Sequence, residues 1–358
     1  MAMETGAVSA ITAMEHNTNT WNGTAIACGA DSELRITSEG VAGGKAALER
    51  ATLGKPHGDK PDVGPEGHRG PITFDVFYGG RSGKFLSYIM GSDGTAAGGG
   101  TTQTHISDFS DSLTRLFTFV IRKRSGAIPW EYATAKMAQL ILRVGGDGQV
   151  EAEASIISSA LARASTINNT TTITTVSLVT NTTTGQSTAI LGRALLTDGV
   201  FRLNAQAGGA LAASDGICIR DFTATFVRPL DETFMACATP SGMAEPFEDG
   251  FNLSTFGFSL RSYDQETFED AWAAGTEYKC DLTFTGPAGS TATNMTHLFE
   301  FPRAVVMEKP QAPVSGPNFI PHDVTLKLLE ATAAPTGMSG TKPCRYTCID
   351  QDATDYFA

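Results

Sequence analysis

The sequence has few charged residues for its length, and basic residues are scarcer than acidic ones. Only 18% of its 358 residues are charged, and 26 Lys and Arg stand against 38 Asp and Glu, so the net charge is −12. A chain of this sign repels phosphate groups, which argues against tight binding to DNA or RNA. Hydrophobic residues make up 41% of the chain. That proportion excludes a disordered protein, because disordered chains combine low hydrophobicity with high net charge.

Long apolar runs and a cysteine framework are also missing. No uninterrupted apolar stretch approaches the length of a transmembrane helix, so we expect neither a membrane span nor a membrane partner. Six cysteines are too few for a disulfide scaffold, and the first basic residue, Arg35, comes too late for a signal peptide. We therefore expect a chain made in a reducing cytoplasm. Cys344 and Cys348 lie four apart on a predicted strand, which places two buried, reduced thiols on one face.

Catalytic and metal-binding motifs are absent or incomplete. The stretch Gly79–Lys84 resembles a phosphate-binding loop, but its glycines are one residue too close and Phe85 replaces the Ser or Thr that binds magnesium. His57 with Asp59 and Asp62 is a weak metal-site alternative in a segment rich in Gly and Pro. No nucleophile elbow and no paired zinc-binding histidines are found. We therefore expect no enzymatic activity, no metal and no cofactor.

The composition instead favours a mainly β protein of about two domains. The chain contains 38 glycines, and runs rich in Thr, Val, Ile and Phe recur between them. Ile72–Tyr78 and Ser254–Leu260 both alternate apolar and polar residues with the period of a half-buried strand, at an offset of 182 residues. Leu113–Phe119 matches Met295–Phe301 at the same offset. The sequence therefore predicts a tandem duplication.

A short helix is predicted after the early strand of each copy. In the first copy Ser82 is the expected N-cap, Phe85 and Ile89 lie four apart on one face, and Gly91 ends the helix. The second copy repeats this pattern about 183 residues later: Ser262 and Gln265 form a capping box, Phe268 and Trp272 share the inward face, and Gly275 ends the helix. A later strand, Met137–Val144, resembles Asp323–Glu330 at a larger offset.

We predict four segments along the chain. Residues 1–21 form an N-terminal arm, residues 22–164 the first β-domain, residues 165–207 a Thr- and Asn-rich connector, and residues 208–358 the second β-domain. The first domain carries a long polar loop at residues 40–70. Loops of this length are usually functional or contact-forming, although a mobile surface excursion is the alternative.

The two-copy pattern resembles the tail tube (major tail) proteins of long-tailed bacteriophages, in a form with duplicated domains. The residues that carry the resemblance, over about two thirds of the chain, are Gly23–Ala27, Ile72–Gly91, Leu116–Val120, Leu140–Val144, Gly148–Val150, Ser315–Ile320, Val324–Leu329 and Ala334–Met338. The long loop and the Thr-rich connector depart from the family pattern. The resemblance implies two tail-tube-like β-sandwich or barrel domains, each with one short flanking helix.

The resemblance also implies an assembly and its partners. Single-domain tube proteins form six-membered rings, so a duplicated chain is expected to form trimeric rings with pseudo-sixfold symmetry that stack into the conduit for DNA ejection. Joining open sheet edges in a closed ring also protects those edges. The implied location is the virion tail, assembled in the host cytoplasm. Implied partners are the tape measure protein, the tail terminator and tip proteins, and double-stranded DNA that passes through the lumen without specific binding.

Two residue sets are predicted to serve this assembly. The long loop is the expected ring-stacking contact, through Lys55, His57, Asp59, Lys60, Glu66, His68 and Arg69. An acidic lumen would pass DNA without holding it, because each basic contact to a phosphate adds affinity. The acidic second half supplies its candidates, namely Asp231, Glu232, Glu245, Glu248, Asp249, Glu277 and Asp281. The competing interpretation is that these carboxylates keep the exterior soluble, or pair with Arg122, Lys123 and Arg124 of a neighbouring subunit.

Two other functions remain open from the sequence. One is a virion decoration or adhesion module built from β-sandwich domains, and the other is a hydrolase on a β-sandwich. An adhesin predicts export and surface aromatic residues, whereas an enzyme predicts a pocket with converging titratable groups.

Overall fold

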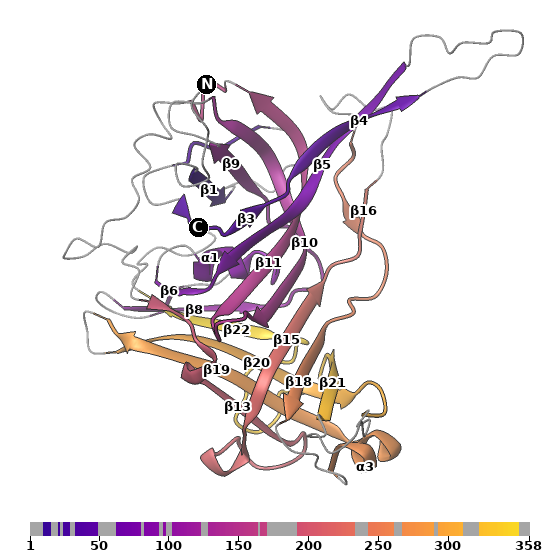
Figure 1. Cartoon of the computed structure of the whole chain (residues 1–358). Helices are drawn as coiled ribbons and strands as arrows, with labels where there is room; N and C mark the ends of the chain where they lie inside the picture. The colour runs from indigo at the N-terminus through magenta and orange to yellow at the C-terminus, as the bar shows by residue number, and fades with distance from the viewer. Residues whose placement is uncertain are drawn as a thin grey trace, which may run out of the picture.

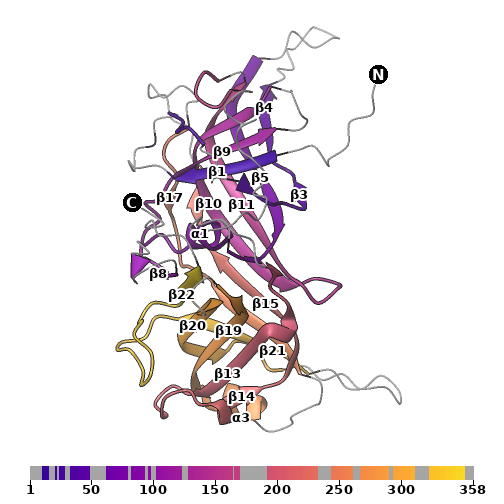
Figure 2. The same ribbon diagram turned by 90° about the vertical axis from the view of Figure 1, so that its left-hand side faces the viewer.

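The chain is mainly β, with large antiparallel sheets and few helices in a sandwich-like arrangement (Figures 1 and 2). The computed structural model describes residues 10–15, 21, 24–28, 33–48, 62–79, 82–92, 96–97, 102–122, 128–163, 165–169, 192–232, 243–260, 267–289, 293–310 and 322–350. No helix in these ranges is long and apolar enough to span a membrane. The first half of the chain forms the upper part of the molecule in Figure 2, and the second half forms the lower part.

Six strands of the first half form one antiparallel row. In spatial order they are β3 (Ser38–Glu39), β5 (Asp62–Asp75), β11 (Val150–Arg163), β10 (Trp130–Val144), β9 (Phe117–Arg122) and β1 (Ala10–Glu15). Two further strands extend the row: β4 (Ala42–Leu48) pairs with β5 next to β3, and β2 (Glu33–Leu34) pairs with β1.

The second half repeats this row. Its spatial order is β15 (Ile219–Val227), β18 (Thr255–Leu260), β21 (His322–Leu329), β20 (Asn294–Val306), β19 (Glu277–Ala288) and β13 (Gly199–Ala205). Numbered by their place in the chain, the strands of both rows have the order 2-3-6-5-4-1. A short helix lies between the third and fourth strands in each half, α1 (Ser82–Ser87) and α3 (Thr267–Ala274). The two halves therefore share one topology.

The remaining short elements complete the sheets. They are β6 (Phe77–Tyr78), β7 (Ala96–Ala97), β8 (Gln103–Asp108), β12 (Gly192–Arg193), β14 (Gly216–Ile217), β16 (Leu230–Asp231), β17 (Phe247–Glu248), β22 (Arg345–Asp350) and the 3-10 turns at Leu196–Asp198 and Ala213–Asp215. β22 pairs with β20 and also with β8, so a strand of the first half joins a sheet of the second.

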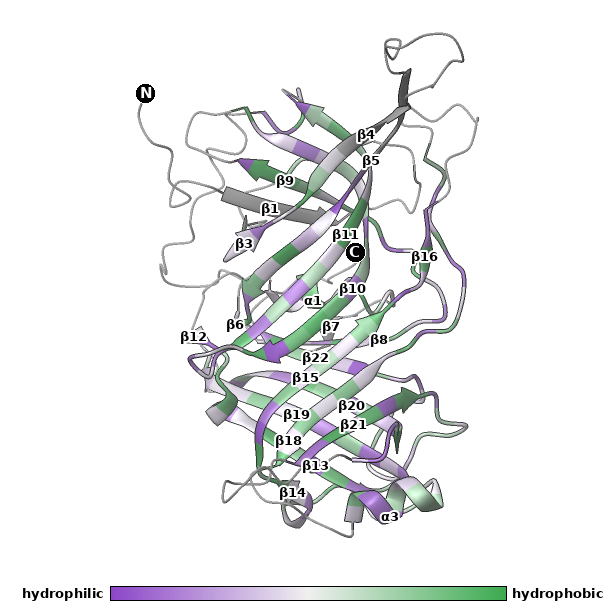
Figure 3. Cartoon of the chain, turned by 45° about the vertical axis from the view of Figure 1, so that its right-hand side comes forward, coloured by the Kyte–Doolittle hydropathy of each residue, from purple (hydrophilic) through white to green (hydrophobic). Residues whose placement is uncertain are grey.

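The two rows join edge to edge. β10 is longer than its neighbours, and one of its edges carries β9 near its start and β15 near its end. At the junction Ile141 lies opposite Thr225 and Leu142 opposite Ala224. One antiparallel sheet therefore runs from β5 in the first half to β20 in the second. Figure 3 shows β11, β10, β15, β18 and β21 of this sheet side by side.

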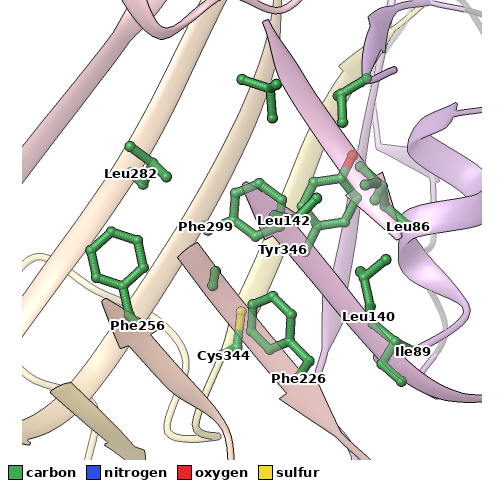
Figure 4. Close-up of a cluster of buried hydrophobic side chains, with 14 of the residues drawn as sticks. Leu86, Ile89, Leu140, Leu142, Phe226, Phe256, Leu282, Phe299, Cys344 and Tyr346 are labelled. Carbon is green, nitrogen blue, oxygen red and sulfur yellow. The ribbon is translucent and has the colours of Figure 1, made fainter. Parts of the chain in front are cut away.

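Alternating apolar side chains build one core that crosses this junction. On β18 and β21 every second residue is buried, as the period of two requires. The sheet of the second half curls so that Phe201 of β13 meets Phe256 of β18, with ring centroids 5.0 Å apart. Figure 4 shows Leu86 of α1 and Ile89, just beyond this helix, in one cluster with Phe226 of β15, which belongs to the other half.

The predicted duplication is correct for the early strand and helix, but wrong for the later strands. Phe74 on β5 and Phe256 on β18 are both third strands, as the offset of 182 residues predicts. Leu113–Phe119 leads into β9, the fourth strand, whereas Met295–Phe301 lies on β20, the fifth. The match of Met137–Val144 with Asp323–Glu330 likewise pairs the fifth strand with the sixth. The extra strand β8 lengthens the first half after its helix, which shifts the sequence alignment by one strand.

The helix predictions are partly correct. Phe85, Ile89 and Phe268 are buried, and Gly91 and Gly275 have the positive φ of residues that end helices. Trp272, however, is 44% exposed, and Ala271 turns inward in its place. The Ser82 hydroxyl does not act as the expected cap; it donates a hydrogen bond to the carbonyl of Phe77 at 2.8 Å. Ser262 and Gln265 lie outside the described residues.

Residues 40–70 are not a loop throughout, contrary to prediction. β4 and the first part of β5 pair as a two-stranded ribbon that extends beyond the body of the molecule (Figure 1). Glycine allows the close approach at its base: a Cβ on Gly70 would lie 2.3 Å from the carbonyl oxygen of Gly40. The low β propensity of the segment is overridden by this pairing. Similarly, β1 falls within the predicted arm and β13 within the predicted connector, and each is the first strand of its row.

Candidate functional site

The predicted ring-stacking residues are divided between the ribbon and segments outside the described residues. Lys55, His57, Asp59 and Lys60 lie outside the described residues, and Glu66 lies on β5 opposite Lys45. His68 is buried at the base of the ribbon, with its ring 5.8 Å from that of Tyr132. Arg69 is exposed and forms an ion pair with Glu232 of the second half at 3.3 Å. The stacking role stays a prediction.

The predicted acidic set lies in two places rather than one. Asp231, Glu232, Glu245, Glu248 and Asp249 lie on or beside β16 and β17, whereas Glu277 and Asp281 lie on β19. At least five of the seven carboxylates form ion pairs, in the combinations Glu232–Arg69, Glu245–Lys136, Glu248–Arg228, Glu277–Arg303 and Asp281–Arg202. The partners belong to this chain. Pairing with Arg122, Lys123 and Arg124 of a neighbouring subunit stays a prediction.

The site that sequence reasoning missed is the junction between the halves, and Arg228 is its central residue. It follows β15 directly, and its side chain is fully buried. The guanidinium donates hydrogen bonds to the carbonyls of Ile89, Met90 and Ser110 at 2.7–2.9 Å, and to a carboxylate oxygen of Glu248 at 2.8 Å.

The guanidinium also lies 3.9 Å from the ring centroid of Phe109, a distance that suits a cation–π contact. Burial lowers the pKa of Arg228, and the neighbouring Glu248 carboxylate opposes this shift. The contacts tie the end of β15 to the C-terminal end of α1, which belongs to the other half. No local sequence signal marks this site, since its partners are distant in the chain.

The segment that contains β16 and β17 makes further contacts with the first half. The indole of Trp21 donates a hydrogen bond to the carbonyl of Met243, whose side chain is fully buried. Lys136 of β10 is buried and reaches both the Pro246 carbonyl and the Glu245 carboxylate, at 2.9 and 2.8 Å. A surface pocket of about 410 Å³ remains between this segment and the first half, lined by Asp111, Ser112, Leu113, Lys136, Leu230, Glu245, Pro246, Phe247 and Glu248.

The joined sheet has one face in the core and one open face. Residues on the open face alternate with the buried ones, for example Ile141 between Leu140 and Leu142 on β10. The open face carries charges of both signs: Glu151, Glu153, Asp221 and Asp323 are acidic, and Arg69, Arg143 and Lys327 are basic. Asp75 of β5 is buried. Arg193 lies beside this face and forms an ion pair with Asp75 at 3.1 Å.

A second group of titratable residues is buried where β8, β20 and β22 meet. His297 contacts the Tyr346 hydroxyl at 2.8 Å, and His105 contacts Asp350 at 3.1 Å. Burial lowers the pKa of His297. Cys344 and Cys348 are buried, as predicted, and neither of them is in a disulfide. All these side chains are at most 1% exposed, so the cluster is part of the core rather than a surface pocket. No group of His, Cys, Asp and Glu in the described ranges is arranged to hold a metal.

Comparison with known proteins yields little. No protein-family model matches the chain, and no curated protein matches it. Among solved structures, the chain is similar to one described as a crystal structure of Hcp protein. The two are 11% identical over 36% of this chain and 86% of that chain, with a TM-score of 0.23. A similarity of this size does not establish a shared function.

Proposed function

We propose that the chain is a structural subunit of a bacteriophage tail tube. Three copies would form a ring with pseudo-sixfold symmetry, and stacked rings would form the conduit for DNA. The observation that carries the proposal is the edge-to-edge junction between two halves of equal strand order. In that junction the fifth strand of one row, β10, pairs with the second strand of the next, β15.

A repeated junction of one kind forms a closed ring when its rotation closes, and an open helix when it does not. In the described residues the outer edge of β3 and β4 has no strand partner, so the row can be extended at its first end. Open edges must be covered or they aggregate, and a closed ring covers them all. With two rows in each chain, three chains supply six rows. The sequence resemblance to tail tube proteins supports the same arrangement.

The open face of the joined sheet is the proposed wall of the lumen. The carboxylates of Glu151, Glu153, Asp221 and Asp323 lie on this face, where they would repel phosphates and avoid the counterion release that holds DNA. This assignment replaces the predicted β16–β17 residues, which are largely ion-paired, with the carboxylates of the open face, of which Glu151 and Glu153 form ion pairs with Arg143. The tape measure, terminator and tip proteins are the proposed further partners. The proposal assigns no catalytic step to the chain.

Negative-stain microscopy of the purified protein tests the proposal. We expect rings or tubes with a central channel at concentrations that permit assembly. A protein that remains monomeric at every concentration and salt condition would contradict it. A decoration or adhesion module would instead bind a preformed surface without assembling alone.

A further inference from the structure

The two halves each contain an excursion at the same place in the strand order. The chain leaves the sheet after the second strand and returns as the third strand. In the first half this excursion covers residues 40–71 and includes β4 and the start of β5. In the second half it covers residues 227–253 and includes β16 and β17. The two excursions are therefore topological equivalents.

The excursion of the second half is bound to the first half of its own chain. Arg228 fixes its start to the end of α1, while Met243, Glu245 and Pro246 contact Trp21 and Lys136. Every one of these contacts crosses between the halves. The equivalent excursion of the first half extends beyond the body instead (Figures 1 and 3).

The helices α1 and α3 differ in burial, as the two excursions differ in their contacts. All six residues of α1 are buried, and the Ile89 carbonyl just beyond it accepts a hydrogen bond from Arg228. In α3 only Phe268 and Ala271 are buried. Phe85 and Ile89 lie four residues apart, as do Phe268 and Trp272, so Trp272 is the counterpart of Ile89. Ile89 is fully buried, whereas Trp272, in the last turn of α3, is 44% exposed. Among the residues that the structure describes, α3 thus has no cover like that which α1 receives.

We infer that the β4–β5 ribbon of one chain docks on the second half of another copy of the chain, against the C-terminal end of α3. Within one chain, the β16–β17 segment contacts the end of α1. The proposed contact is its equivalent between two chains. It rests on the proposed function and assigns the ribbon to contacts within a ring, in place of contacts between rings. Trp272 is the apolar anchor of the docking surface, since large aromatic residues dominate the energetics of interfaces.

A photo-crosslinking experiment tests the contact directly. Trp272 is replaced by the photoreactive amino acid benzoylphenylalanine, assembled protein is irradiated, and the crosslinked peptides are identified by mass spectrometry. We expect crosslinks between chains to peptides within residues 42–67. The matched control places the same group at Val200, an exposed apolar residue on β13, where no crosslink to those peptides is expected. Crosslinks from position 272 that map elsewhere in assembled rings would overturn the inference.

Shortening the ribbon separates the two possible roles of the segment. Lys45 and Glu66 are paired, so residues 46–65 can be replaced by a two-residue Asn-Gly turn. If the ribbon joins chains within a ring, the variant stays folded, elutes at the mass of a monomer and forms no rings. Isolated, unstacked rings or normal tubes would overturn the inference while leaving the proposed function intact. If the parent protein itself forms no rings, the proposed function fails instead.

Discussion

At the scale of single residues, buried charges concentrate where the two halves meet. Arg228 satisfies three carbonyls and the Glu248 carboxylate within a closed site. Such an ion pair contributes little net stability compared with an apolar replacement of both partners, but removal of one partner leaves an uncompensated charge. The residue therefore fixes the geometry of the junction between the halves.

Substitution Arg228→Met is expected to destabilise the protein by about 3–5 kcal/mol, because it leaves the Glu248 carboxylate buried without its cation. Urea unfolding measures this change. The double variant Arg228→Met/Glu248→Gln removes the unpaired charge and should recover part of the loss. A cost below about 1 kcal/mol for the single variant, in the range of an exposed ion pair, would show that Arg228 does not hold the junction.

A second charged group crosses five strands in register. Arg202, Asp281, Glu300, Arg345 and Asp108 lie opposite one another on β13, β19, β20, β22 and β8. Arg345 donates two hydrogen bonds to Asp108, at 2.7 and 2.8 Å. Glu300 lies between Asp281 and Arg345. Burial is the main cause that raises the pKa of Glu300 above its usual value of 4.5.

The raised pKa of Glu300 predicts a pH dependence of stability. The folded state binds the proton more tightly than the unfolded state, so this contribution is complete below pH 4.5 and is lost as the pH rises through the folded-state pKa. Glu300→Gln cannot ionise, and we expect it to raise the melting temperature at pH 7 but not at pH 4. Melting curves across this range test the prediction. A variant less stable than the parent at pH 7 would show that the attraction of Arg345 dominates.

At the scale of elements, the sequence predicts the features of strands and helices that are determined by residues close to one another in the chain. The alternation of Phe74, Val76 and Tyr78, and the pairs that bury Phe85 and Phe268, are local signals that the structure confirms. Trp272 was misplaced because α3 is only eight residues long and the described residues bury only Phe268 and Ala271 of it. The ribbon was missed because Gly- and Pro-rich strands lack β propensity and gain their structure from pairing. Arg228 was missed because its partners come from three separate segments of the chain.

The base of the ribbon depends on a glycine. A methyl group at Gly70 would lie 2.3 Å from the Gly40 carbonyl oxygen and 2.6 Å from the Cα of Val41, both backbone atoms that cannot rotate away. Gly70→Ala is therefore expected to cost about 1–3 kcal/mol, the usual penalty of overpacking. Gly146→Ala is the matched control, because a methyl group there meets no atom within 4 Å. Equal unfolding free energies for the two variants would contradict the strand pairing at this position.

At the scale of the whole molecule, the chain consists of two halves with one strand order and a sheet that passes from one to the other. The sequence alone indicated the duplication, but not that a strand of each half would join the sheets of the other. The halves are joined by backbone pairing, by β8 beside β22 and by the Arg228 contacts. Contact of the outer edge of β3 and β4 with a neighbouring chain is the basis of the proposed ring.

A cryo-electron microscopy reconstruction of the assembled protein, calculated without imposed symmetry, tests this account most directly. It predicts rings of three chains, with six similar β-rows around the channel and the open face of the joined sheet lining it. Rings built from six full-length chains, or a channel lined by other surfaces, would contradict it.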